Sequence, residues 1–424
     1  MTGRPGPGPE AARVVVAGGG FGGLSALDRL ARRSLHVTLV DANSYSTFQP
    51  LLYQVATAGL TSADVAYPLW SAARKAGAHF RKGTLTGIEP DARRVLLADG
   101  AALGYDYLIL ATGVGAAFYG VTGAAEHSFS LYTRRDAIVL RDRVMAELER
   151  RSIAGDDREL DITVVGGGAT GVELAGTLAE LRNIALPAAF PELDPARMQV
   201  RLIEQGAALL APFRARLRDY ARTELLDRGV DVRLMTSIKE VRADQVLLAD
   251  GDVLPSDITV WAAGVTAPPW TAGLGLPTGT GGRLLTGEDL RVVGQDRIFA
   301  VGDIASGWAT GGQPLPQLAQ PAIQEGRHAA GQIIRLLAGQ PTRPFRYKDK
   351  GIMATIGHRS AVVELPSRIR VRGTIAWLAW LALHLITLLG NRNRISALVN
   401  LSWRYLTWSR GGGVIVGDDP PGAA

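Results

Sequence analysis

Two glycine-rich loops carry the clearest chemical signal in the sequence. In the first loop, Gly18, Gly20 and Gly23 follow a β-branched run and open a helical pattern. The first glycine of such a loop permits the turn, the second lets the backbone approach a pyrophosphate, and the third lets helix and strand pack closely. The next strand ends at Asp41, whose carboxylate can accept hydrogen bonds from ribose hydroxyls. A tight turn in an ordinary α/β domain would need no such acid, so the combination predicts a dinucleotide site.

A second loop has the same layout, with Gly166, Gly168 and Gly171 between a strand and a helix. Its acid, Glu204, ends a strand and lies 38 residues after Gly166; a proline-broken segment explains this wide spacing. A carboxylate there binds the adenosine ribose and repels a 2′-phosphate, so we expect NADH to be preferred over NADPH. The alternative is that Glu204 ends the strand by chance.

Two dinucleotide sites on one chain suggest a flavin that stays bound and a nicotinamide that exchanges. A strand that ends at Gly302 and Asp303 supports the flavin, since the acid can reach its ribityl hydroxyls. A helix expected near Pro321 would point its N-terminus at the flavin ring and stabilise negative charge there.

The elements that position these residues are repeated about 150 residues apart. Each half reads strand, glycine loop, helix and strand, followed by a hairpin with its turn at Asp99-Gly100 or Asp250-Gly251. The duplication predicts an α/β fold with two Rossmann-like domains, one for FAD and one for NADH, plus a C-terminal membrane-associated helical unit. The expected parts are a disordered N-terminus (1–10), an FAD-binding domain in two pieces (11–120 and 276–344), an NADH-binding domain (121–275) and a membrane-anchoring region (345–424).

Composition narrows the chemistry and the partners. The chain of 424 residues has no cysteine, which excludes disulfides, cysteine-ligated metals, a thiol nucleophile and a redox dithiol. Residues 343–410 hold 12 Lys+Arg and 2 Asp+Glu, a net charge of +10, whereas the remainder carries −4. These basic residues flank apolar runs, which favours an anionic lipid surface over nucleic acid. The first ten residues lack the apolar core of a secretory signal, so we expect a cytoplasmic location.

Four stretches carry a resemblance to a known family. They read YSTFQPLLYQVATAGL at 45–60, ATGVELA at 169–175, QLAQPAIQEG at 317–326 and AWLAWLALHLITLLGNRNR in the tail. Together with the two glycine loops, they resemble the type II NADH dehydrogenases. These are single-subunit, non-pumping NADH:quinone oxidoreductases of the two-dinucleotide-binding-domain flavoprotein superfamily.

The resemblance implies hydride transfer from NADH to FAD and then two-electron reduction of a membrane quinone. It implies that Gln49 lies beside the flavin and that Glu173 lies near the point where nicotinamide meets flavin. Gln320 and Gln324 match the quinone-site motif, and no metal is expected. The cofactor-binding residues would be Gly18, Gly20, Phe21, Gly23, Asp41, Ala111, Thr112, Gly113, Gly166, Gly168, Gly171, Glu204, Ala263, Gly264, Gly302, Asp303 and Ala319.

The glutamines also make a case by their spacing alone. Gln317, Gln320 and Gln324 lie at i, i+3 and i+7, which places them on one face of a helix. Amides can donate to and accept from a quinone carbonyl without bringing charge into an apolar channel. The alternatives are a polar surface face for the glutamines and, for Glu173, a first-turn carboxylate favoured by the helix dipole.

The tail predicts attachment to a membrane. Residues 373–389 are apolar but borderline in length for a span, and arginines flank them on both sides. The next segment is amphipathic, with Asn393, Ser396, Asn400, Arg404 and Thr407 on one face. Helices lying in the interface at the cytoplasmic face of the cell membrane fit this pattern. A domain-capping helix or a dimer interface is the alternative, and a homodimer stays open.

Two other functions remain to be weighed against quinone reduction. One is a soluble NAD(P)H-dependent flavoprotein reductase that passes electrons to a protein acceptor such as ferredoxin. The other is a nucleotide-sensing flavoprotein bound to a partner. Neither needs an apolar, tryptophan-rich tail, which is why the sequence favours the quinone reductase.

Overall fold

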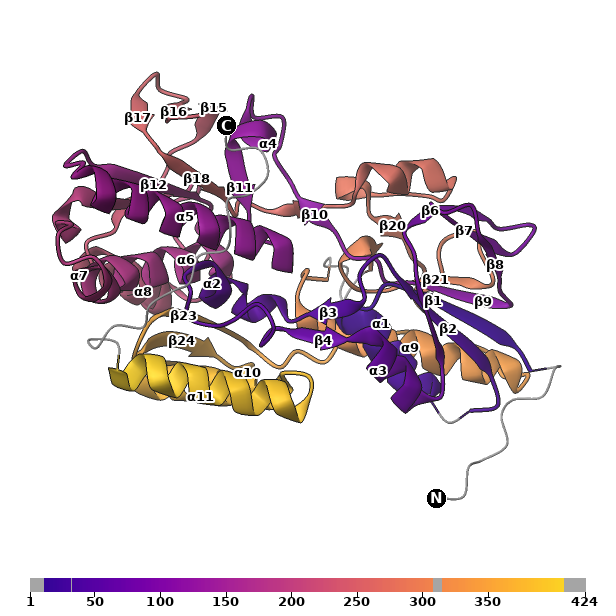
Figure 1. Cartoon of the computed structure of the whole chain (residues 1–424). Coiled ribbons are helices and arrows are strands. Elements are labelled where there is room, and N and C mark those ends of the chain that lie inside the picture. Colours follow the sequence, from indigo (N-terminus) through magenta and orange to yellow (C-terminus); the bar gives the residue numbers. More distant parts are fainter. Residues whose placement is uncertain (1–10, 32, 308–314, 408–424) are drawn as a thin grey trace. The chain divides into compact units, whose positions relative to one another are not determined.

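The computed structural model describes residues 11–31, 33–307 and 315–407, with backbone only for 404–407. The disorder predicted for residues 1–10 lies outside the described residues. The chain forms two compact units (Figure 1). Unit 1 holds the chain up to Ser46, Tyr67–Gly115 and Val265–Asp349; unit 2 holds Thr47–Ala66, Ala116–Gly264 and the chain from Lys350 on. Residues 47–66 and the C-terminal region pack within unit 2, and the assignment of the predicted domains to FAD, NADH and the membrane stays a prediction.

Unit 1 is built on a parallel sheet in the order β21-β9-β1-β2-β5. The strands are β1 (Arg13–Ala17), β2 (His36–Asp41), β5 (His79–Lys82), β9 (Tyr107–Leu110) and β21 (Ile298–Ala300). Buried Val, Leu and Ile side chains on both faces form two cores, as expected of a parallel sheet with both faces covered. Helices α1 (Phe21–Leu30), α3 (Leu69–Ala76) and α9 (Ala319–Leu337) lie on one side of it (Figure 1).

Unit 2 repeats this sheet in the order β11-β18-β12-β13-β14, again parallel throughout. The strands are β11 (Ser128–Ser130), β12 (Leu160–Val165), β13 (Met198–Ile203), β14 (Asp231–Arg233) and β18 (Ile258–Trp261). Helices α5 (Arg134–Ala154), α6 (Ala169–Glu180) and α8 (Ala215–Asp227) cover it. The same strand order in both units confirms the predicted α/β fold with two Rossmann-like domains.

The duplication also extends to an antiparallel three-stranded sheet in each unit. In unit 1 it comprises β6 (Leu85–Glu89), β7 (Arg94–Leu97) and β8 (Ala102–Gly104). In unit 2 it comprises β15 (Ile238–Val241), β16 (Gln245–Leu248) and β17 (Val253–Pro255). The hairpin turns hold Gly100 at φ +83° and Gly251 at φ +100°, which explains the Asp-Gly pairs in the sequence.

The proline-broken segment after the second loop is largely helical. A π-helical turn at Leu181–Ala185 and α7 (Leu186–Ala189) continue α6, and the 3₁₀ turn Pro195–Arg197 then leads into β13. The remaining short elements are β3 (Tyr45–Thr47), a 3₁₀ turn at Gln49–Leu51, α2 (Leu52–Ala56), β4 (Ala66–Pro68), β10 (Gly115–Ala116), α4 (Ala124–His127), β19 (Val265–Thr266), 3₁₀ turns at Pro269–Leu274, Thr280–Gly282 and Gly302–Ile304, β20 (Leu284–Leu285) and β22 (Ala305–Ser306).

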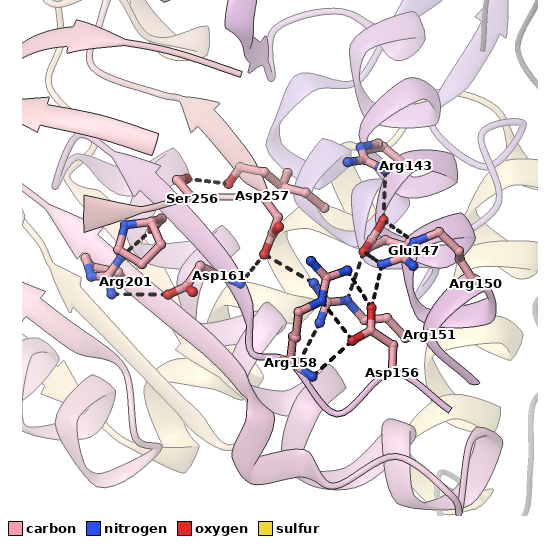
Figure 2. A network of polar contacts seen from close by, with 12 residues as sticks. Arg143, Glu147, Arg150, Arg151, Asp156, Arg158, Asp161, Arg201, Ser256 and Asp257 are labelled. Carbon is pink, nitrogen blue, oxygen red and sulfur yellow. Dashed lines mark hydrogen bonds and ion pairs between the residues drawn. The ribbon is translucent and has the colours of Figure 1, made fainter. Parts of the chain in front are cut away.

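A network of ion pairs fixes α5 to the start of β12 (Figure 2). Glu147 accepts hydrogen bonds from Arg150 and Arg151, and Arg151 also pairs with Asp257. The carboxylate of Asp257 in turn accepts the backbone N–H of Asp161 at 2.8 Å. Burial alone would raise the pKa of Glu147, but the guanidinium groups of Arg150, Arg151 and Arg143 outweigh it and hold that pKa below its usual range. Because β12 leads into the second glycine loop at its other end, the network stabilises the scaffold and does not line that loop.

The C-terminal region begins with a three-stranded antiparallel sheet and ends in the two helices that the tail sequence predicts. The elements are β23 (Ile352–Gly357), β24 (Ser360–Glu364), β25 (Arg370–Arg372), α10 (Thr374–Thr387) and α11 (Asn391–Thr407). Helix α10 packs on β23 and β24 within unit 2 (Figure 1). Among the described residues, no helix combines the length and the apolar character that crossing a membrane requires.

Candidate functional site

The first glycine loop has the geometry that its sequence predicts. Gly18 adopts φ +110°, and a Cβ there would come within 2.2 Å of the Ala111 carbonyl oxygen. A Cβ at Gly23 would meet the Gly18 carbonyl oxygen at 1.8 Å, so helix and loop pack too closely for any other residue. A Cβ at Gly20, by contrast, would meet no described atom within 4 Å. Gly20 is also the N-cap of α1, whose first residue is Phe21, and no described side chain caps it. The loop therefore leaves an open cradle of backbone N–H groups for an anion.

The acid of this loop braces it from the end of β2. Asp41 Oδ2 accepts the Gly19 N–H at 2.6 Å, and Oδ1 accepts the Asn43 N–H at 2.7 Å. Burial raises the pKa of Asp41, although these two backbone donors oppose the shift. The carboxylate is thus fixed in place, and its remaining lone pairs can accept from a ribose.

The second loop repeats this arrangement. Gly166 adopts φ +109°, a Cβ at Gly171 would meet the Gly166 carbonyl oxygen at 1.9 Å, and a Cβ at Gly168 would meet no described atom within 4 Å. Glu204 directly follows β13; its Oε2 accepts the Gly167 N–H and its Oε1 the Gly206 N–H, both at 2.6 Å. These two bonds make a chance position for Glu204 untenable, because the carboxylate is built into the loop.

A cavity of about 340 Å³ opens beside the second loop. Its charged lining consists of Glu204 and Arg218, and the Arg218 Nε is buried without a hydrogen-bond partner among the residues described. Arg218 lies on α8, far along the chain from the loop, so sequence reasoning missed it. The other lining residues are Gly167, Gly168, Gly206, Ala207, Ala208, Ala211 and Pro212.

The remaining residues of unit 1 that the sequence analysis predicts to hold the flavin are backbone supports and one hydroxyl. Ala111 supplies the carbonyl oxygen that packs on Gly18, Gly113 adopts φ +70° and Gly302 adopts φ +73°. The Thr112 hydroxyl is buried and has no hydrogen-bond partner in the described part of the chain. Asp303 lies in the 3₁₀ turn after β21. An unsatisfied hydroxyl beside an open glycine cradle fits a bound polar molecule at this edge of the sheet.

Ala263 and Gly264, which the sequence analysis predicts to bind a cofactor, pack against the second loop. A Cβ at Gly166 would lie 2.7 Å from the Ala263 Cα, so the two segments pack backbone to backbone. Gly264 has φ +153°, and a Cβ there would come within 2.1 Å of the Tyr119 hydroxyl oxygen. Ala263 therefore contacts the loop through its backbone, and Gly264 leaves no room for a Cβ beside Tyr119.

Glu325 is a buried acid that sequence reasoning missed. It lies on α9 with 2% of its surface exposed, and its Oε2 accepts the backbone N–H of Gly302. Burial raises its pKa to about 7, against the opposing effects of that hydrogen bond and of the Arg283 charge. The sequence signal that could have found it is the glycine that follows it. A Cβ at Gly326 would meet the Gly22 carbonyl oxygen at 2.1 Å, so this glycine marks where α9 approaches α1 closely.

The predicted glutamine face is only partly correct. Helix α9 starts at Ala319 with Leu318 as its N-cap, so Gln317 precedes the helix and donates to the Asp303 carbonyl oxygen at 3.4 Å. Pro321 lies in the first turn, where its missing N–H costs no helical bond. The shared face therefore reduces to Gln320 and Gln324.

The two helical glutamines differ in what their amides contact. Gln324 donates to the Lys348 carbonyl oxygen at 2.9 Å and accepts the Lys348 N–H at 3.0 Å, so its amide braces a loop. The Gln320 Oε1 is buried with no hydrogen-bond partner in the residues that the structure covers, and the same holds for the Gln49 Oε1 in unit 2. Buried acceptors without a donor are rare in proteins, so Gln320 and Gln49 are the better candidates for binding a ligand.

Glu173 lies in the second turn of α6, past residues 169–172, so it is not the first-turn carboxylate of the alternative reading. It is buried, and its Oε1 accepts the Thr355 N–H at 3.2 Å. Burial raises the pKa of Glu173 to about 8, because the hydrogen bond from the Thr355 N–H only partly offsets desolvation. Glu173 is therefore protonated at neutral pH and can deliver a proton.

The polar face of α11 is turned toward the protein and its apolar face outward. Asn393 Nδ2 donates to the Ala66 carbonyl oxygen at 2.7 Å, Ser396 Oγ to Asp64 Oδ1 at 2.5 Å, and Asn400 Nδ2 to Asp64 Oδ2 at 2.8 Å. The side chains of the opposite faces of α10 and α11 are large, apolar and 42% to 72% exposed: Ile375, Leu378, Leu383, Ile386, Ile395, Leu398, Val399 and Trp403. The predicted polar positions Arg404 and Thr407 lie outside the described side chains.

The chain matches two family models. Residues 12–326 match the pyridine nucleotide-disulphide oxidoreductase model, and residues 350–408 match that of the NDH2 C-terminal domain. The first family takes its name from disulphide chemistry, which a chain without cysteine cannot perform.

Relatives match along almost the whole chain. The type II NADH:quinone oxidoreductase Ndh of Mycobacterium tuberculosis is 34% identical over 95% of this chain and 90% of its own. The type II NADH:quinone oxidoreductase of Haemophilus influenzae is 28% identical over 88% of this chain and 92% of its own. The solved structure of NDH2 from Plasmodium falciparum in complex with NADH has the same fold, with a TM-score of 0.87, 18% identity and coverage of 95% and 99%. The chain therefore belongs to the pyridine nucleotide-disulphide oxidoreductase family and, within it, to the type II NADH:quinone oxidoreductases.

Proposed function

We propose that this chain is an FAD-dependent NADH:quinone oxidoreductase that does not pump ions. The observation that carries the proposal is the pair of open glycine cradles, each braced by its own acid, in a chain without cysteine. A cysteine-free chain cannot store electrons in a dithiol, so they must pass from the flavin directly to a diffusing acceptor. The names of the relatives give that acceptor as a quinone.

The residues present in unit 1 fit an FAD. The cradle at Gly20 would hold the pyrophosphate of FAD, and Asp41 would bind its ribose. The Thr112 hydroxyl and Asp303 would bind polar groups of FAD beyond the pyrophosphate. When bound, FAD accepts a hydride from NADH and gives two electrons to the acceptor. The protein supplies the orientation and the exclusion of water.

The residues of unit 2 fit NADH. Gly168 leaves room for the pyrophosphate, and Glu204 faces the neighbouring cavity with its carboxylate fixed by two backbone donors. Because the Glu204 carboxylate is held in place, it repels a 2′-phosphate, and we expect NADH to be preferred over NADPH. Arg218 is the one cation on the described lining, and it can offset part of that repulsion.

On the quinone side, the chain offers hydrogen-bond acceptors and a proton. Gln320 and Gln49 each have a buried amide oxygen to satisfy, and their amide N–H groups can donate to a quinone carbonyl. Glu173 is protonated at neutral pH and can supply a proton to the reduced quinone. Gln324 is assigned a bracing role, because its amide is already engaged with Lys348.

Helix α11 packs its polar face on the protein and exposes its apolar face, which supports attachment to a lipid surface. The asparagines of α11 hydrogen-bond to the rest of unit 2, and its leucine, valine and tryptophan side chains are exposed, which is the orientation needed to enter a lipid interface. The net +10 of residues 343–410 fits the anionic lipids of a cytoplasmic leaflet. The exposed apolar faces weigh against the soluble ferredoxin-type reductase and the nucleotide sensor. Self-association of the chain stays a prediction.

Two matched variants test the assignment of the cradles, with bound flavin as the readout. Gly20→Val fills the first cradle and should yield protein that purifies without FAD, seen as the loss of flavin absorbance. Gly168→Val fills the second and should keep one FAD per chain but weaken NADH binding at least tenfold. Loss of FAD from Gly168→Val, or full retention in Gly20→Val, would show that the cofactors are assigned wrongly.

A steady-state assay tests the reaction itself. The purified holoprotein should oxidise NADH beyond one equivalent per flavin only when a quinone is added, and it should reduce the quinone by two electrons. Turnover with ferredoxin and none with quinone would favour the soluble-reductase alternative.

A further inference from the structure

The two charged residues that line the cavity beside the second glycine loop differ in how far the protein satisfies them. Both carboxylate oxygens of Glu204 accept backbone N–H groups, one from Gly167 and one from Gly206. The Nε of Arg218, on the same lining, is buried and has no hydrogen-bond partner among the described residues. A buried donor without an acceptor is rare in a folded protein, which indicates that the acceptor comes from a molecule that enters the cavity.

The stability of α8 gives no reason for an arginine at this position. Arg218 is the fourth residue of α8 (Ala215–Asp227), so it lies at the positive end of the helix dipole, where a cation is unfavourable. The first turn of α8 holds no acidic residue that would balance it. The N-cap residue Arg214, by contrast, pairs with Glu364 on β24. A residue that breaks a local rule of helix stability is expected at a functional site, so Arg218 fits a role in binding.

The rest of the lining indicates what kind of molecule brings the acceptor. Gly168, the N-cap of α6, lines the same cavity, and a Cβ there would meet no described atom within 4 Å. The volume of about 340 Å³ lies in the range of pockets that bind small molecules. The cavity thus joins an anion cradle, a ribose-binding acid and an arginine within unit 2. That set suits the adenosine phosphate half of a dinucleotide, in which an arginine accommodates a phosphate on the ribose 2′-oxygen.

We propose that Arg218 is a specificity-determining residue of the dinucleotide site: it binds the adenosine end of the cofactor and would hold a 2′-phosphate if Glu204 did not repel it. The inference rests on the proposed binding of NADH to unit 2. It goes beyond that binding because it assigns the discrimination against NADPH to one side chain. The site already contains the cation that NADPH needs, and the charge of Glu204 keeps NADPH out.

The contribution of Arg218 differs between the two dinucleotides. The adenosine of NAD⁺ offers Arg218 only neutral acceptors, and one such hydrogen bond changes the affinity by about twofold to tenfold. A 2′-phosphate offers charged oxygens that match the guanidinium group, and a hydrogen bond to a charged group changes the affinity by about tenfold to 100-fold. The negative charge of Glu204 opposes this gain, so the effect of Arg218 on phosphate binding should become visible once that charge is removed.

The test measures the binding of NAD⁺ and NADP⁺ to the oxidised holoenzyme by calorimetry. The two probes differ by the 2′-phosphate alone, and neither can transfer a hydride to an oxidised flavin. The unmodified chain is compared with Glu204→Gln, Arg218→Gln and the double variant. Arg222→Gln is the matched control, because Arg222 lies one turn further along α8, is exposed and is not part of the cavity lining. Arg218→Met keeps the apolar stem and is a second variant in case the glutamine protein fails to fold.

In the Glu204→Gln background we expect Arg218→Gln to weaken NADP⁺ binding about tenfold to 100-fold and NAD⁺ binding only about threefold. Arg222→Gln should change the ratio of the two affinities by less than about twofold, because its charge is screened by salt. Unchanged NADP⁺ affinity in the Arg218 variants, or an equal loss for both dinucleotides, would overturn the inference. If Gly168→Val leaves the NAD⁺ affinity unchanged, the proposed dinucleotide site itself is wrong, and the inference falls with it.

Discussion

Replacing Asp64 tests whether a single buried carboxylate holds α11 with its polar face toward the protein. Asp64 has 3% of its surface exposed and accepts four hydrogen bonds. Two come from Thr61 and stay local, whereas the other two come from Ser396 and Asn400 on α11. In Asp64→Ala the two helix side chains lose their acceptor and remain against the protein surface.

The magnitude follows from the kind of bond that is lost. Hydrogen bonds to charged groups are worth about 1.5–3 kcal/mol each, so two of them set a range of roughly 3–6 kcal/mol. Because Ser396 and Asn400 are only partly buried, water replaces part of this, and we expect a loss near the lower end, about 3 kcal/mol. The buried Ala397 and Leu401 continue to hold the helix, so α11 should loosen without unfolding the domain.

Hydrogen exchange measures this loss directly. A loss of about 3 kcal/mol should raise amide exchange in α11 on the order of 100-fold, while amides in β12 keep their protection. Asp64→Asn keeps one acceptor oxygen and should show a smaller increase. Asp99→Ala, which removes a surface carboxylate paired with Arg81, is the control and should leave α11 unchanged. Unchanged exchange in a folded Asp64→Ala protein would refute the idea that this carboxylate orients the helix.

Three further predictions concern the substrates and the membrane. Glu204→Gln should reduce the ratio of kcat/KM for NADH to kcat/KM for NADPH by at least tenfold, because it removes the charge that repels a 2′-phosphate. Similar kcat/KM values for NADH and NADPH in the unmodified enzyme would contradict the predicted preference. In stopped flow, Gln320→Ala should slow flavin reoxidation by quinone about tenfold and leave reduction by NADH intact. Gln324→Ala should instead lower the unfolding free energy by about 1 kcal/mol, because it loses the hydrogen bonds to Lys348. If Gln320→Ala slows both flavin reduction and flavin reoxidation, the role of Gln320 is structural. Truncation after Arg370 should keep FAD but weaken sedimentation with anionic vesicles, since each Lys or Arg near such a surface contributes about 1 kcal/mol; undiminished binding would refute the anchor.

The sequence was sufficient for the two nucleotide domains because their constraints are local. Gly18 and Gly166 need a positive φ, and Gly23 and Gly171 leave no room for a Cβ, so the glycine spacing alone predicted both loops. The duplicated hairpins followed from turn chemistry in the same way. What these features share is that each residue is constrained by neighbours close in the chain or by the register of one parallel strand pair.

The other site residues depend on partners that no local pattern reveals. Gln324 fits the predicted helix face, yet its amide is taken by Lys348 across a separate loop. The amphipathic pattern of α11 predicted two faces but not that the polar one would turn inward, which depends on Asp64, 336 residues from Asn400. The hydrogen bond from the Thr355 N–H to Glu173 likewise joins segments that only the fold brings together. Long-range pairing, and not residue type, is what the sequence could not supply.

The most direct test of the central claim is a two-step anaerobic stopped-flow experiment on the holoenzyme. In the first step NADH should bleach the flavin absorbance by one two-electron equivalent per chain. In the second step a quinone should restore it in a single two-electron process, with no requirement for a protein acceptor. A flavin that NADH reduces but quinone does not reoxidise would contradict the account.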